Sequence, residues 1–123
     1  MQIRAISPHA LSHVAMLELL SISRVYFGLS KSDGIITALL ETMETGCFPI
    51  QMATSCADEW FVHGQTGMVV DWKDADGISS AIKRALSDDE LIDRAAGLGS
   101  EKIDVLGSIE RIRMASRTYY GLQ

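Results

Sequence analysis

The chain is poor in cysteine and proline, with two of each among 123 residues. Cys47 and Cys56 are too few for a disulfide scaffold, so we expect reduced thiols in a cytoplasmic protein, with Cys47 as a small core residue. Long apolar runs are also missing. No stretch of about 18 apolar residues occurs, which argues against a membrane span. The N-terminus has no charged segment followed by an apolar one, which argues against a secretory signal.

Basic residues are fewer than acidic ones, 11 against 16, and the formal net charge is −5. Nucleic-acid binding needs clustered cations that neutralise phosphates, so nucleic acid is not expected as a partner. The sequence also contains no complete zinc-binding motif. His9 and His13 are four residues apart and could share a helix face, but no Glu follows His9 and no third ligand lies nearby. We therefore expect neither a metal nor another cofactor.

Segments with the pattern of a strand alternate along the chain with segments that have the pattern of a helix. This alternation predicts a parallel α/β fold of about four short strands flanked by helices. Expected strands cover residues 2–6, 24–29, 47–51 and 67–71. Expected helices cover residues 12–21, 35–45, 58–63, 74–86 and 91 to the C-terminus, the last with a break near residues 97–99 or Gly107.

Turn and capping residues predict the boundaries of these elements. Ser12 or Ser7 could cap the first helix, and Gly46 is expected just after the helix at 35–45. Gly64 should stop the helix at 58–63. Ser87 should cap the last helix, with Glu90 completing a capping box. Pro49 predicts that the strand at 47–51 lies at a sheet edge or ends there.

The segment 30–46 reads S-K-S-D-G-I-I-T-A-L-L-E-T-M-E-T-G and is the most informative part of the chain. It places seven residues between Asp33 and Glu41, with Gly34 at the expected start of a helix. A helix N-terminus offers free N–H groups and a partial positive charge, which favour phosphate and sugar oxygens. Glu41 would lie roughly 12 Å along the helix. A nucleotide-sugar has about that extent between its sugar and its ribose, so one helix could hold both ends.

This segment resembles the donor-binding motif of retaining glycosyltransferases of family 4, the group 1 enzymes with the GT-B fold. That motif is usually written E-G-x-P-x-x-x-L-E-A-M-x-x-G-x-P-V. The matching residues here are Asp33-Gly34, Leu40-Glu41-Thr42-Met43, Gly46 and Pro49-Ile50, followed by Glu59-Trp60-Phe61, His63-Gly64, Thr66-Gly67-Met68-Val69-Val70 and Asp74. Asp33 stands where Glu is commoner, and Thr42 where Ala is usual.

The resemblance implies that residues 1–123 form a single partial Rossmann-like domain, the later part of the C-terminal donor-binding domain, with a helical tail. Family enzymes add an acceptor-binding domain and an upstream basic pair on the donor diphosphate. Arg24 and Lys31 match that pair in neither position. We therefore expect a fragment, a split or truncated product, or a stand-alone relic, inactive alone.

The resemblance also assigns the two acids. Asp33 would contact the hexose hydroxyls beside the N–H groups of Gly34 and Ile35, although a helix N-cap is its simpler role. Glu41 would accept hydrogen bonds from the ribose hydroxyls, and its place in an apolar helix makes an unpaired carboxylate costly. Neither acid is expected to act as a general base, because the donor phosphate is thought to assist the acceptor in retaining members.

A second loop should face the first, because residues 30–34 and 52–57 both follow strands of one parallel sheet. Thr54 and Ser55 would approach the nucleotide from this loop. Glu59 could contact the donor, but we expect it to structure the loop by binding backbone N–H groups.

The implied function is transfer of a hexose from a nucleotide-sugar, in assembly of surface polysaccharide or lipopolysaccharide. The expected partners are the nucleotide-sugar, an N-terminal domain or separate chain, and further copies through self-association. Arg111, Arg113 and Arg117 could help the tail to dock. One alternative is a truncated, non-catalytic interaction module that binds another chain. Another is a small flavodoxin-like or receiver-like domain, which is disfavoured because no acidic cluster follows the first strand.

Overall fold

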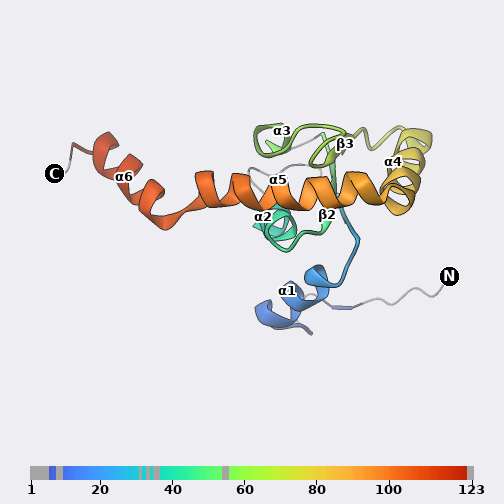
Figure 1. Ribbon diagram of the computed structural model, residues 1–123, viewed down its shortest axis with the longest axis horizontal. Coiled ribbons are helices and arrows are strands. Elements are labelled where there is room, and N and C mark those ends of the chain that lie inside the picture. Colours follow the sequence, from blue (N-terminus) through green and yellow to red (C-terminus); the bar gives the residue numbers. More distant parts are fainter. Residues whose placement is uncertain are drawn as a thin grey trace.

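The computed structural model describes residues 6–7, 10–30, 32, 34, 37–53 and 56–121. These residues confirm the α/β class: they form a three-stranded parallel sheet of order β1–β2–β3, with helices packed around it (Figure 1). The strands are β1 (Val25–Gly28), β2 (Phe48–Met52) and β3 (Met68–Val70). Three of the expected strands are thereby confirmed to within a residue or so. The strand expected at 2–6 lies almost wholly outside the described residues.

The expected edge position of Pro49 is wrong, because β2 is the central strand and Pro49 pairs with Tyr26 of β1. Phe48 donates its backbone N–H towards β1, to the carbonyl of Arg24 at 3.0 Å. Backbone groups alternate sides along a strand, so the nitrogen of Pro49 faces the β3 side. Pairing with β3 begins one residue later, at Ile50 with Met68. The missing N–H therefore removes no ladder hydrogen bond.

The helices follow the expected order, and those between residues 37 and 107 flank the sheet (Figure 1). Their bounds are α1 (His13–Ser21), α2 (Thr37–Glu44), α3 (Ala57–Trp60), α4 (Ala75–Ser87), α5 (Asp89–Gly107) and α6 (Ile109–Tyr119). The capping prediction for α1 is confirmed, because the Ser12 hydroxyl accepts the N–H of Ala15 at 3.2 Å. Gly46 follows α2 with a φ of 77°, as expected for the residue after a helix end.

The helix expected at 58–63 is too long, because α3 ends at Trp60. Phe61 is extended, with φ −135° and ψ 159°, and its ring is 2% exposed. It packs with Leu39 and Met43 of α2 in a small apolar cluster. Burial of this ring outweighs the local preference for another helical turn. Gly64, with a φ of 76°, belongs to the turn that leads into β3 rather than to a helix end.

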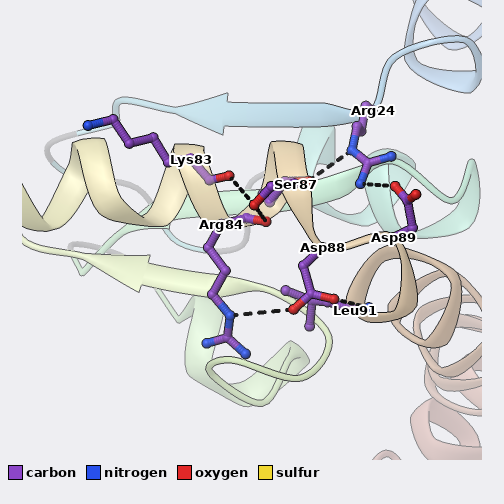
Figure 2. Close-up of polar contacts among 8 residues, drawn as sticks. Arg24, Lys83, Arg84, Ser87, Asp88, Asp89 and Leu91 are labelled. Carbon is purple, nitrogen blue, oxygen red and sulfur yellow. Dashed lines mark hydrogen bonds and ion pairs between the residues drawn. The ribbon is translucent and has the colours of Figure 1, made fainter.

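The cap expected at Ser87 is also wrong, as Figure 2 shows. Ser87 is the last residue of α4, and its hydroxyl donates to the carbonyl of Lys83 at 3.0 Å. The cap of α5 is Asp88, whose Oδ1 accepts the N–H of Leu91 at 2.9 Å. Because α4 runs one residue further than expected, the first residue free to cap the next helix is the aspartate.

Arg24 fixes this junction to the start of β1. Its Nε donates to the carbonyl of Ala85 at 2.9 Å, and its guanidinium forms an ion pair with Asp89 at 2.7 Å (Figure 2). The α4–α5 turn is therefore held at the amino end of the sheet, the end opposite to the loops of interest.

Of the two breaks expected in the C-terminal helix, the later one is confirmed. Helix α5 continues through residues 97–99 and ends at Gly107, and Ser108 caps α6 by accepting the N–H of Arg111 at 3.2 Å. Gly99 is buried where α5 packs against α2. A Cβ there would lie 3.4 Å from the carbonyl oxygen of Met43, which is ordinary van der Waals contact, so this packing does not require a glycine.

Two apolar clusters form the core, one on each face of the sheet. The larger joins the strands to α4 and the first half of α5, through Phe48, Ile50, Met68, Val70, Ala81, Ala85, Leu91 and Ala95. The smaller joins α2 and α3, through Leu39, Met43, Ala57 and Phe61. Cys47 is buried, as expected. Leu86 of α4 is 56% exposed, because it lies at the margin of the apolar side of that helix.

Helix α6 lies apart from this core. None of its residues is buried, and Figure 1 shows it projecting from the end of α5. Ile109, Ile112 and Met114 are 59%, 53% and 69% exposed. The expected helical tail is thus confirmed, and it carries apolar side chains that no other described element covers.

Candidate functional site

The candidate site lies at the carboxyl edge of the sheet, where ligands bind in open parallel sheets. Gly28 at the end of β1 pairs with Gln51 in β2, so the loops that follow these two strands start side by side. Gly34 belongs to the first loop and is exposed. Asp33, Ile35, Thr54 and Ser55 lie outside the described residues, and their proposed contacts stay predictions.

Glu41 lies on α2, on the side that faces α1 and β1. Its side chain is 20% exposed, and its Oε1 lies 2.6 Å from the Nε2 of His13 in α1. Tyr26 lies near this carboxylate, in β1. Burial raises the pKa of Tyr26, and the negative charge of Glu41 raises it further. Glu41 therefore contacts an imidazole, and its charge acts on a nearby phenol.

His13 is the residue that sequence reasoning missed, since it was considered only as half of a metal site and that site was rejected. It lies 28 residues from Glu41 in the chain, and no local pattern links the two. Among the described residues, no group of three His, Cys, Asp or Glu side chains could hold a metal ion.

Glu59 lies on α3 and has separate partners. The carboxylate contacts the thiol of Cys56, whose pKa is raised mainly by the charge of Glu59, with burial and their hydrogen bond as smaller causes. The backbone carbonyl of Glu59 accepts from Nζ of Lys102 in α5 at 2.7 Å. These contacts fasten the end of the second loop to α5. A loop-structuring role for Glu59 fits them and stays a prediction.

The carboxyl edge is hollowed beside β2 and β3. A depression of about 280 Å³ is lined by Ala53, Asp71, Trp72 and Lys73. A smaller one of about 140 Å³ is lined by Ala53, Ala57, Asp58 and Val69. Larger depressions lie on α6, on α1 and between β3 and α4. The first two are formed by exposed helix faces, and the third is lined by β3 and one side of α4. We therefore place the candidate site at the strand ends.

Over the part of the chain that is described, no helix is long and apolar enough to cross a membrane.

Family membership follows from the sequence match to known proteins. Residues 4–99 match the profile of the family described as glycosyl transferases group 1, which is well over half of the 123 residues. The chain belongs to the group 1 glycosyltransferases. Comparison with curated protein sequences gives no match.

Solved structures of glycosyltransferases share the fold. HepE (Alr3699) of Anabaena, solved with UDP-glucose, has a TM-score of 0.70 at 16% identity, over 85% of this chain and 30% of that one. The C-terminal domain of the group 1 protein LpcC from Francisella tularensis has a TM-score of 0.69 at 20% identity, over 87% of this chain and 53% of that one. Sucrose-phosphate synthase of Thermosynechococcus elongatus has a TM-score of 0.63 at 24% identity, over 70% of this chain and 22% of that one.

At such low sequence identities, these structural matches establish the fold alone. They confirm the expected Rossmann-like GT-B architecture. The chain spans about a fifth to about a half of the structures that it matches. This group 1 domain is therefore partial with respect to them.

Proposed function

We propose that this group 1 domain binds the nucleotide-sugar donor of a retaining, family 4 hexosyltransferase, as the later part of its C-terminal domain. The observation that carries the proposal is the position of Glu41. It lies on α2, the helix that follows the loop at the carboxyl end of β1, and it is only partly exposed. A carboxylate there can accept hydrogen bonds from two neighbouring ribose hydroxyls.

The proposed donor is a nucleoside diphosphate hexose. HepE, which shares the fold, was solved with UDP-glucose and with UDP and glucose. In this proposal Asp33, Gly34 and Ile35 hold the hexose, and Thr54 and Ser55 approach the nucleotide. No metal or cofactor is required. The proposed pathway is assembly of surface polysaccharide or lipopolysaccharide in the cytoplasm, a compartment that the free thiols of Cys47 and Cys56 favour.

Replacing Glu41 by alanine is expected to remove most nucleotide binding. We expect UDP to bind the intact chain near millimolar, which corresponds to about 4 kcal/mol. Loss of hydrogen bonds to a charged group should cost about 1.5–3 kcal/mol, or roughly tenfold to 150-fold in affinity. Chemical-shift titration with UDP measures both dissociation constants.

Glu44→Ala is the matched control, because Glu44 is an exposed carboxylate at the end of the same helix. Its affinity for UDP should equal that of the unchanged chain. Equal affinities in Glu41→Ala and Glu44→Ala would refute the ribose contact.

The isolated chain is expected to bind a donor without transferring its sugar. Holding an acceptor in line with the donor can supply roughly 7–11 kcal/mol of the barrier, and we assign the acceptor to a separate domain or chain. The exposed apolar residues of α6 should drive self-association. The assay combines purified chain, a panel of nucleotide-sugars and glycan or lipid acceptors, with the mass measured in solution. Turnover by a monomer would contradict this expectation.

The second candidate function is a non-catalytic interaction module. The uncovered apolar residues of α6 favour it, since a helix of 11 residues that buries none of its side chains gains little stability from its own fold. Absence of UDP binding, together with a stable complex with another chain through α6, would favour this candidate over the first.

A further inference from the structure

The contact between His13 and Glu41 points to a residue that no motif of the sequence identifies. We propose that His13 is a positioning residue, which orients the Glu41 carboxylate towards the ribose of the donor. The proposal rests on the proposed function and adds to it a specific dependence on α1.

The first support is geometric. His13 is the first residue of α1, and the Ser12 cap fixes that helix end beside it. The distance of 2.6 Å between His13 Nε2 and Glu41 Oε1 is that of a short, charge-assisted hydrogen bond. This contact occupies one oxygen of a carboxylate that has two. A ribose diol presents two adjacent hydroxyls, so it needs the carboxylate in one orientation, and a bond to one oxygen supplies that orientation.

The second support is the arrangement of nearby charges. Arg24 is engaged by the Ala85 carbonyl and by Asp89, and Lys102 by the carbonyl of Glu59. Within the described part of the chain, the basic group that contacts Glu41 is His13. The carboxylate therefore has its hydrogen-bonding partner on α1, which comes before β1 in the sequence.

The third support separates this role from stability. The side chain of His13 is 69% exposed, whereas that of Glu41 is 20% exposed. Removing the imidazole therefore sacrifices little packing, and its loss should change binding without changing the melting temperature.

The experiment measures UDP affinity by chemical-shift titration of the full chain. His13→Ala is expected to weaken binding about threefold to tenfold, the range for one hydrogen bond. His13→Gln keeps an N–H donor at similar reach and should restore affinity to within about twofold, because one hydrogen bond is regained. Val14→Ala is the matched control, since Val14 is the next residue of α1 and is 64% exposed. All three variants should melt at the temperature of the unchanged chain.

The double variant His13→Ala/Glu41→Ala tests whether His13 acts through Glu41. It should bind UDP as weakly as Glu41→Ala alone, and a further loss would overturn the proposal by showing direct contact with the nucleotide. Unchanged affinity in His13→Ala, while Glu41→Ala loses binding, would overturn it and leave the donor site intact. Tighter binding in His13→Ala would also overturn it, because His13 would then compete with the ribose. Absence of UDP binding by the unchanged chain would refute the proposed function, and this inference with it.

Discussion

Replacing Phe48 by alanine is expected to lower the free energy of unfolding by about 3–5 kcal/mol, the usual cost of removing a buried aromatic ring. Phe48 opens the central strand and is 1% exposed. Its ring belongs to the larger cluster, together with Ile50, Ala85 and Leu91. Because those neighbours come from three different elements, the backbone cannot collapse into the cavity left by the ring. Urea denaturation followed by circular dichroism measures the change.

Ile112→Ala is the control for this substitution. Ile112 lies on α6 and is 53% exposed, so its truncation should change the free energy of unfolding by less than about 0.5 kcal/mol. A loss below about 1 kcal/mol for Phe48→Ala would contradict the packing described here, since core truncations of this size cost more. The free energy of unfolding of a single domain is about 5–15 kcal/mol, so the loss expected for Phe48→Ala is a large fraction of the total stability.

The sheet could be predicted from the sequence because its strands carry strong local signals. Each strand is a short run of apolar and β-branched or aromatic residues between turn residues, as in V-Y-F-G over residues 25–28. Gly46 marked the end of α2 because few other residues adopt a positive φ. These features depend on neighbours a few residues away, and a single sequence contains them.

The errors in the predicted secondary structure arose where contacts with distant parts of the chain determine the local conformation. Pro49 is compatible with the central strand only because pairing with β3 starts after it, and the sequence does not contain that register. Phe61 leaves the helical conformation because its ring packs against α2, about 20 residues earlier. The cap of α5 moved from Ser87 to Asp88 because α4 ran one residue further, a difference below the precision of any capping pattern.

The candidate site also has features that local sequence predicts and features that depend on distant contacts. The spacing of Asp33 and Glu41 indicated one helix carrying an acid two turns from its start, and the structure places Glu41 on that helix. The surroundings of Glu41 come from elsewhere in the chain. His13 contacts it from α1, which depends on how α1 packs against α2. Tyr26 lies near it in β1, which depends on how α2 packs against the sheet.

Gln51 is a residue that no pattern in the sequence singles out. It follows Ile50 in the central strand, is fully buried, and neither Oε1 nor Nε2 has a hydrogen-bond partner within the described structure. Its amide lies over Gly28. A Cβ on Gly28 would be 2.8 Å from the Gln51 Cδ and closer still to Oε1, so the glycine makes room for the amide.

Replacing Gln51 by methionine is therefore expected to raise the free energy of unfolding by about 1–3 kcal/mol, the cost of burying an unpaired polar group. Methionine fills a similar volume and is unbranched, so it can follow the same path over Gly28 without overpacking. Gly28→Ala is the matched control and should lower the free energy of unfolding by about 1–3 kcal/mol, because its methyl group must displace the amide within a filled interior. Urea denaturation of the two variants gives opposite shifts of the midpoint if the amide is unpaired and lies over Gly28. A lower midpoint for Gln51→Met would contradict the prediction, because it would mean that the amide forms hydrogen bonds in solution that methionine cannot replace.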